Sequence, residues 1–170
     1  MSKPLLAYLV FLAGAFTWCM LILAAPLLTH AGGSEAAWGS VLYEGFHRIC
    51  HQYDSRTLHI AGEPLGVCSR CSGIYFAFLA GTLCYPLLRD LRRPVVPSRG
   101  LLVVALIPML IDAGLGFAGL HEISTTTRLI TGSVFGALIP FVILPVALAA
   151  VIERTSLSPP FHQPKGPVDA

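Results

Sequence analysis

Residues 5–28 read LLAYLVFLAGAFTWCMLILAAPLL and contain no charged side chain. At a rise of about 1.5 Å per residue, a helix of this length crosses the ~30 Å hydrocarbon core of a bilayer. Lys3 and the small residues near Ala24 and Ala31 resemble a secretory signal peptide, but the run exceeds the usual ~7–15 apolar residues. The sequence therefore predicts a retained membrane span, with a cleaved signal peptide as the alternative.

Three more apolar runs follow along the chain. They cover residues 71–88, 101–120 and 129–152. Backbone polar groups in lipid must pair within their own span, so each run is expected to be helical, with kinks at Pro140 and Pro145. Gly132 and Gly136 are expected to let the last span approach a neighbour closely. The sequence thus predicts an all-α fold, a polytopic membrane four-helix bundle.

The composition agrees with a membrane protein and excludes one class of partner. Of 170 residues, 55% are hydrophobic and 12% are charged, against about 25% charged in an average globular protein. Mean hydropathy is +0.73. A soluble domain of this size would leave too much apolar surface in water, so the lipid bilayer is the expected partner. A net charge of +2 without a basic tract excludes nucleic acid.

Lysine and arginine are unevenly distributed between the two ends of the predicted spans. Seven fall on the side of the termini and four on the other side. Cytoplasmic loops carry the excess of these residues, so both termini are predicted to be cytoplasmic and the loop 29–70 extracytoplasmic. We expect one membrane domain, residues 1–152, and a disordered cytoplasmic tail, residues 153–170.

Within the loop, residues 38–49 show a helical pattern. Apolar side chains recur at positions 41, 42, 46 and 49, and polar ones share the other face. This pattern predicts a short amphipathic helix in the membrane interface. Gly39 and Gly45 weaken a helix, so an ordinary loop is the alternative.

Three of the five cysteines lie near the start of the second span. Cys68 and Cys71 form a Cys-x-x-Cys motif, and Cys50-His51 precedes it by about 18 residues. One interpretation is a metal site, in which these four residues supply the Cys3His ligand set typical of zinc. Because adjacent ligands strain a site, His47 or His59 is an alternative to His51.

Two other interpretations of these cysteines stay open. Cys68 and Cys71 can be a reactive dithiol at a helix N-terminus, where the dipole and Arg70 lower a thiol pKa and Cys50 is the exchange partner. Alternatively, Cys50 forms a structural disulfide with Cys68 or Cys71, in keeping with an oxidising extracytoplasmic compartment.

Charged residues near the outer ends of the spans form a second candidate group. Arg70 and Arg128 lie at helix entrances, where a cation opposes the helix dipole at about 0.3–1 kcal/mol. Asp112 lies inside a span, where a charge costs at least ~2.5 kcal/mol, and needs Arg70 or Arg128 as partner. With Arg56, this group predicts a cavity for an anion. The alternatives are a purely structural ion pair and arginines that anchor to lipid phosphate.

These motifs resemble those of a known family. The stretches Cys50-His51-Gln52 and Cys68-Ser69-Arg70-Cys71-Ser72-Gly73, together with Asp112-Ala113 and the Arg128–Gly132 element, are similar to the signature of small bacterial and archaeal membrane proteins catalogued as domain of unknown function 2085. The family's Asp-Gly is Asp112-Ala113 here, and a Gln expected shortly afterwards is not found. The resemblance implies a cytoplasmic-membrane location and a site shared by Cys50, His51, Gln52, Arg56, Cys68, Arg70, Cys71, Asp112 and Arg128. It implies no reaction.

Together these observations predict a two-part site on the outer face of the membrane. The metal ligands are Cys50, His51, Cys68 and Cys71, the catalytic residues are Asp112, Arg70 and Arg128, and the substrate-binding residues are Gln52 and Arg56. The expected substrate is an anionic lipid or a phosphorylated small molecule. The alternative functions are a quinone-linked thiol–disulfide oxidoreductase and a non-enzymatic transport or accessory subunit.

Overall fold

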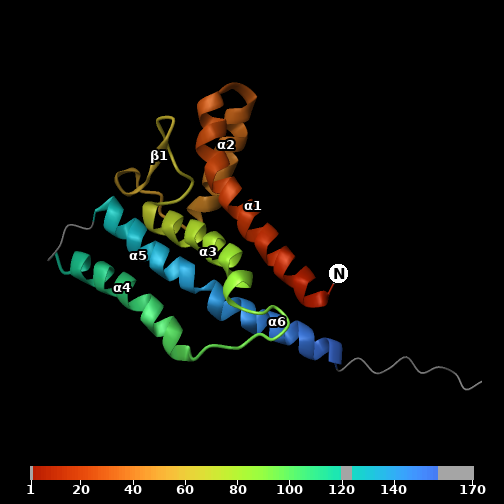
Figure 1. Ribbon diagram of the computed structural model, residues 1–170. Coiled ribbons are helices and arrows are strands. Elements are labelled where there is room, and N and C mark those ends of the chain that lie inside the picture. The colour runs from red at the N-terminus through yellow and green to blue at the C-terminus, as the bar shows by residue number, and fades with distance from the viewer. Residues whose placement is uncertain (1, 120–123, 157–170) are drawn as a thin grey trace, which may run out of the picture.

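The computed structural model describes residues 2–119 and 124–156, and most of these residues are helical (Figure 1). The helices are α1 (Lys3–Ala31), α2 (Gly33–His47), α3 (Ser69–Leu88), α4 (Arg99–Phe117), α5 (Thr125–Leu138) and α6 (Pro140–Ser156). Four stretches are long and apolar enough to cross a membrane, namely α1, α3, α4 and the α5–α6 pair. The predicted all-α membrane four-helix bundle is confirmed.

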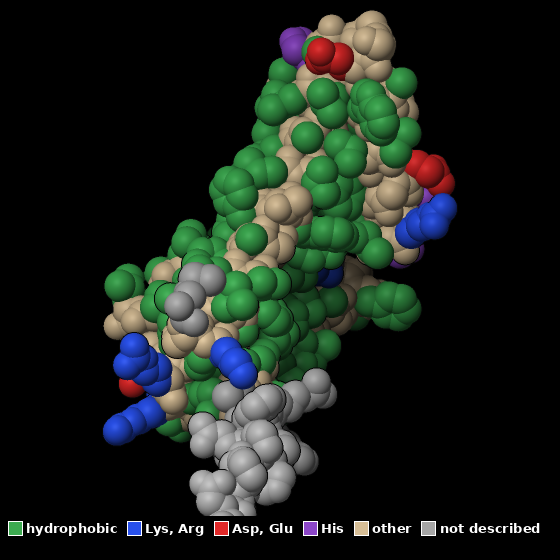
Figure 2. All heavy atoms as spheres, turned by 90° about the vertical axis from the view of Figure 1, so that its right-hand side faces the viewer, with side chains coloured by type: hydrophobic (Ala, Val, Ile, Leu, Met, Phe, Trp, Pro, Cys, Tyr) green, Lys and Arg blue, Asp and Glu red, His purple; other side chains and the backbone are tan. Residues whose placement is uncertain are grey.

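Lipid must cover most of the apolar surface of these helices. Only between 11% and 28% of the apolar window of each span is buried within the protein. Large side chains such as Val10, Leu87 and Leu110 are more than half exposed. Figure 2 shows hydrophobic side chains over the middle of the molecule and charged ones gathered towards its ends. In water this surface would oppose folding, whereas in a bilayer it is solvated.

The predicted fourth span consists of two helices. α5 begins earlier than predicted, at Thr125, because the Ser124 side chain caps it and accepts a hydrogen bond from the Thr127 amide at 3.1 Å. A new helix starts at Pro140, which has no N–H to continue the hydrogen bonding of α5. Residues 153–156 belong to α6 instead of the predicted tail, and residues 157–170 lie outside the described residues.

The start of α1, the end of α3 and α6 meet at one end of the bundle. Tyr8, Tyr85, Leu144 and Leu148 form a buried cluster there. The Tyr8 hydroxyl also donates a hydrogen bond to the Thr82 carbonyl at 3.1 Å. The basic loop after α3 therefore lies at the same end as the start of α1. Which membrane face this end occupies stays a prediction.

At the other end, α1 and α2 form an antiparallel helical hairpin (Figure 1). α2 begins at Gly33, before the predicted amphipathic segment, and packs along the end of α1. Gly39 allows this contact, because a Cβ there would lie 2.3 Å from the Thr29 hydroxyl and 3.1 Å from the Ala25 carbonyl. A glycine that weakens an isolated helix here stabilises a pair of helices.

Two glycines of α5, together with Gly73 and Gly81 of α3, bring the two helices into backbone contact. A Cβ on Gly132 would lie 2.4 Å from the Arg70 carbonyl oxygen, and one on Gly136 would lie 2.2 Å from the Ile74 carbonyl oxygen. The predicted close approach of the last span to a neighbour is therefore confirmed. The same packing fixes the start of α5 beside the start of α3.

The rest of the outer loop holds the short helix η1 (Asp54–Arg56) and a hairpin of β1 (His59–Ile60) and β2 (Glu63–Pro64). Ala61 and Gly62 have φ of 54° and 86°, as a two-residue type I′ turn requires. The sequence predicted turns here but not paired strands. The hairpin returns the chain to the bundle just before Cys68.

Candidate functional site

Three cysteines meet where the outer loop joins α3. Cys50 follows the end of α2, Cys68 is the residue before α3, and Cys71 lies in the first turn of α3. Their sulfur atoms all lie within 4.8 Å of one another. The Cys68 amide donates a hydrogen bond to Cys50 Sγ at 3.2 Å. The two ends of the outer loop therefore meet at the start of α3, where Cys50 contacts Cys68 and Cys71.

A small hydrophobic core holds the cysteines in place. Ile22 of α1, Phe46 of α2, and Leu65 and Val67 of the loop are buried together with Cys50. Each of these segments contributes apolar side chains that no lipid can reach, so the loop is anchored by burial as well as by hydrogen bonds. The core is built from three segments, α1, α2 and the outer loop, and is therefore a tertiary feature.

The environment of Cys68 favours its thiolate. Hydrogen bonding with the side chain of Cys50, and then with that of Cys71, holds the pKa of the Cys68 thiol well below its ordinary value, and the amides of Cys71 and Arg70 lower it further. A thiolate is both the metal-binding and the nucleophilic form of cysteine. Cys68 is therefore held in the form that either chemistry needs.

A tetrahedral metal ion fits the sulfur geometry. With zinc–sulfur bonds of ~2.3 Å, sulfur ligands lie about 3.8 Å apart, within the observed limit of 4.8 Å. Among the described residues, these three cysteines are the one group of metal-ligating side chains so arranged. The structure supports a three-cysteine metal group, and it does not identify the metal as zinc.

The histidines lie outside this cysteine group. His51 is exposed, and its ring stacks on Tyr53 with centroids 5.9 Å apart. His59 Nε2 lies 2.9 Å from the Asp54 carboxylate, and His47 is exposed. Because Cys50 points into the core, its neighbour His51 points away. The predicted fourth ligand is therefore not brought to the metal group in this conformation.

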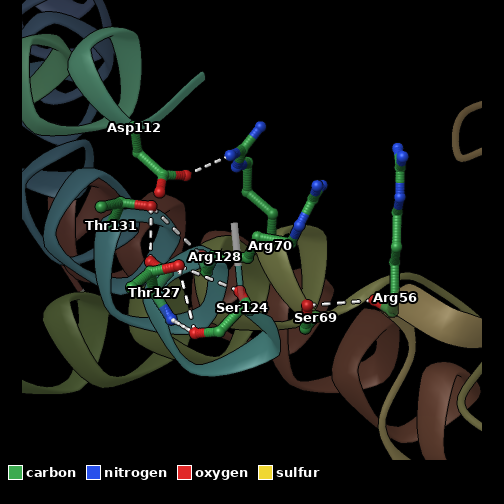
Figure 3. Close-up of polar contacts among 8 residues, drawn as sticks. All are labelled: Arg56, Ser69, Arg70, Asp112, Ser124, Thr127, Arg128 and Thr131. Carbon is green, nitrogen blue, oxygen red and sulfur yellow. Dashed lines mark hydrogen bonds and ion pairs between the residues drawn. The ribbon is translucent and has the colours of Figure 1, made fainter. Parts of the chain in front are cut away.

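The carboxylate inside the third span has the partner that the sequence suggested. Asp112 Oδ2 is paired with Arg70 Nη2, and the side chains are 7% and 21% exposed (Figure 3). α4 therefore approaches the start of α3 through an ion pair, in contrast to the glycine contacts of α5. Because both side chains are largely buried, removing either partner would leave the other as an uncompensated charge, which is costly.

Two more arginines extend to the same side as Arg70 (Figure 3). Arg128 comes from the first turns of α5, and Arg56 ends η1, where its carbonyl accepts a hydrogen bond from the buried Ser69 hydroxyl at 3.0 Å. Within the part of the chain that the structure describes, Nε of Arg70 and Nε of Arg128 are buried without a hydrogen-bond partner. Buried N–H donors without an acceptor favour the binding of an anion that accepts hydrogen bonds from them.

One cavity of about 830 Å³ contains both groups. Its lining includes Cys50, Cys68, Cys71, Arg56, Arg70, Arg128, His51 and Gln52. Asp112 does not line the cavity and acts on it through Arg70. Thus eight of the nine predicted site residues lie around one space, although they come from the loop, α3 and α5.

The family model for predicted membrane proteins, domain of unknown function 2085, matches residues 50–142. The chain belongs to this family. An uncharacterized protein of Methanocaldococcus jannaschii is 33% identical over 150 residues, which cover 86% of this chain and 96% of that protein. An uncharacterized protein of Methanothermobacter thermautotrophicus is 36% identical over 90 residues, covering 51% of this chain and 77% of that protein. No solved structure matches the chain.

The region that the family model matches begins at Cys50 and includes every predicted site residue. The helical hairpin of α1 and α2 lies before the matched region. It nevertheless supplies Ile22 and Phe46 to the core that contains Cys50. The family assignment supports location in a membrane and gives no activity.

Gln52 has a different environment from the other predicted site residues. It has a positive φ of 46°, and its Nε2 donates hydrogen bonds to the carbonyls of Tyr43 at 3.0 Å and Gly66 at 2.6 Å. These bonds tie the end of α2 to the segment before Cys68. Gln52 lines the cavity, but its amide nitrogen is already used to position the loop.

Sequence reasoning missed several apolar residues that line the cavity. These residues are Ile49, Ile74, Met109 and Phe117. The spacing of Ile74, three residues after Cys71, could have placed it on the same face of α3. No sequence signal identifies Met109 and Phe117, because α4 reaches the cavity only through tertiary packing.

Proposed function

We propose that this membrane protein binds a transition metal ion through Cys50, Cys68 and Cys71 and holds an anionic, phosphate-bearing substrate beside it. The observation that carries the proposal is the shared cavity, which places three thiols and three guanidinium groups around one space. We place the cavity on the extracytoplasmic face, from the distribution of basic residues.

The arginines have the chemistry that phosphate requires. A guanidinium group donates several hydrogen bonds from a planar fork and stays protonated in proteins. Arg70 is oriented by Asp112, while Arg56 and Arg128 have no carboxylate partner among the ion pairs of the described residues. The arginine group therefore carries three positive charges against the one negative charge of Asp112, and a phosphate dianion would balance the difference.

Three thiolates would leave one position of a tetrahedral zinc ion open to water or substrate. Catalytic zinc sites keep such a position, and structural sites fill it with a fourth protein ligand. A metal ion here would supply a Lewis acid and would lower the pKa of its bound water. The arginines would orient the anion towards that position.

Metal analysis of the purified protein tests the metal group. We expect close to one metal ion per chain in the wild type and almost none in Cys68→Ser. Cys84→Ser is the matched control, because Cys84 is exposed and lies in the same helix away from the cavity. Equal metal content in Cys68→Ser and the wild type, or no metal in either, would contradict the proposal.

A second candidate function is thiol–disulfide exchange. All five cysteines are free, and the three clustered thiols are close enough to form a disulfide after a small movement. In this function two thiols would pass two electrons and two protons to a quinone and form one disulfide. A mixed disulfide trapped in cells by Cys71→Ser would favour it, whereas thiols protected by metal would not.

A further inference from the structure

An apolar groove lies at membrane depth between three of the spans. Its volume is about 330 Å³, within the ~300–1,000 Å³ range of ligand pockets. Its walls come from α1 (Ala15, Trp18), α3 (Ile74, Tyr75, Phe78), Phe135 of α5 and Ile139, which directly follows α5. None of these described residues carries a charge. An occupant of the groove must therefore be hydrocarbon.

The groove adjoins the arginine cavity along one face of α3. Ile74 lines both spaces. Cys71, Ile74 and Phe78 are three and four residues apart, so they share one helical face. This face rises by about 10 Å from Cys71 to Phe78. A molecule whose head reaches the arginines therefore has its tail at the groove.

The wall of the groove is supported by the same core as the cysteines. Trp18 makes edge-on contacts with Tyr75, at a centroid distance of 5.7 Å, and with Phe46, at 5.4 Å. Phe46 in turn packs in the core that holds Cys50. The groove and the site are therefore parts of one packed unit.

We infer that the substrate is an amphiphile, with a phosphate head among Arg56, Arg70 and Arg128 and a hydrocarbon tail in the groove. This inference rests on the anion binding proposed above and adds a subsite for the tail. A water-soluble phosphate ester would use only the cavity, and a neutral lipid would use only the groove. A molecule with both parts is the one that matches both surfaces.

Three probes separate the two subsites in protein purified in a neutral detergent. Glycerol 3-phosphate carries the head, monooleoylglycerol carries the tail, and lysophosphatidic acid with one oleoyl chain carries both. We expect lysophosphatidic acid to bind at least tenfold more tightly than either of the others. Equal binding of lysophosphatidic acid and glycerol 3-phosphate would overturn the tail subsite and leave the proposed anion site intact.

Variants that fill the groove test the placement of the tail. Ala15→Trp and Ile139→Trp extend into the groove from opposite walls, and each should remove the advantage of lysophosphatidic acid over glycerol 3-phosphate. Val10→Trp is the control, because Val10 is 64% exposed on the same helix and does not line the groove. Metal content and the circular dichroism spectrum verify that each variant is folded. A folded pair of groove variants that keeps the full advantage would overturn the inference.

The binding of glycerol 3-phosphate tests the proposed anion site independently of the tail subsite. If glycerol 3-phosphate and lysophosphatidic acid both fail to bind, or if Arg128→Gln leaves their binding unchanged, the anion site is wrong and the tail subsite is overturned with it. If glycerol 3-phosphate binds and only the tail effect is missing, the further inference alone is overturned.

Discussion

Both ends of the bundle carry clustered arginines, yet they differ in what surrounds the charges. Arg89, Arg92 and Arg93 follow α3 at one end and are exposed, and the first two line a hollow of about 600 Å³. At the other end, Arg56, Arg70 and Arg128 surround a cavity that also contains three thiols, and two of their Nε atoms are buried. Water and lipid headgroups satisfy the first set. Of the second set, Arg70 and Arg128 are partly withdrawn from water and lipid headgroups, whereas Arg56 is exposed.

The difference shows that burial and neighbours identify a site better than the number of charges. An exposed arginine on a membrane protein anchors it to lipid phosphate and sets its topology. A partly buried one must be stabilised by a carboxylate or a bound anion. Only one carboxylate, Asp112, is paired with an arginine at the site end among the described residues. This imbalance is the physical basis of the proposed function.

The largest effect is expected from Asp112→Asn. This change leaves Arg70 without its buried counter-charge, and breaking such a pair costs about 3–5 kcal/mol. The thermal unfolding midpoint should fall clearly, whereas Asp90→Asn at the other end should not change it, since Asp90 is exposed. An Asp112→Asn protein as stable as the wild type would contradict the structural role of the pair.

The next effect concerns the contact that places Arg70 beside Arg128. Gly136→Val would force a side chain against the Ile74 carbonyl, and overpacking of this kind costs about 1–3 kcal/mol. Gly114→Val is the control, because no heavy atom lies within 4 Å of a Cβ at Gly114. Equal unfolding midpoints of the two variants would show that α3 and α5 are not in backbone contact.

A smaller effect is expected from Gln52→Ala. The loop would lose two hydrogen bonds that position Cys50 relative to Cys68, and loss of supporting contacts typically lowers metal affinity by about 10–100-fold. Competition with a metal chelator measures this change. Asp54→Asn, in the same loop and exposed, should keep the wild-type affinity. If both variants keep it, Gln52 does not position the ligands.

The smallest effect compares one arginine from each end. Arg128→Gln should weaken binding of inorganic phosphate about tenfold, which is the lower end of the effect of a hydrogen bond to a charged group, about 1.5–3 kcal/mol. Arg92→Gln should leave phosphate binding unchanged. Isothermal titration calorimetry measures both, and a similar loss in the two variants would mean that the effect comes only from net charge.

Much of the fold and part of the site follow from local patterns. Span length and the absence of charge predict the four apolar helices, the small-xxx-small spacing predicts the contact at Gly136, and the cost of a charge in lipid predicts a partner for Asp112. Each of these follows from what a single helix requires in a bilayer. Such requirements can be read without knowing the tertiary structure.

The remaining features depend on contacts between segments far apart in sequence. His51 was a reasonable ligand by spacing, but the core around Cys50 turns it towards Tyr53. The hydrogen bonds of Gln52 depend on a backbone with positive φ and on carbonyls from two other segments. The groove needs the relative placement of three helices, which no periodicity within one helix specifies.

Cobalt(II) spectroscopy tests whether the thiols and the arginines serve one site. Cobalt in place of the native metal gives visible absorption bands that depend on its ligands, and inorganic phosphate is then titrated into the loaded protein. We predict that phosphate changes these bands in the wild type and in Arg92→Gln, and that Arg128→Gln needs about tenfold more phosphate for the same change. Bands that stay constant as phosphate binds would show that the metal and the anion occupy separate sites.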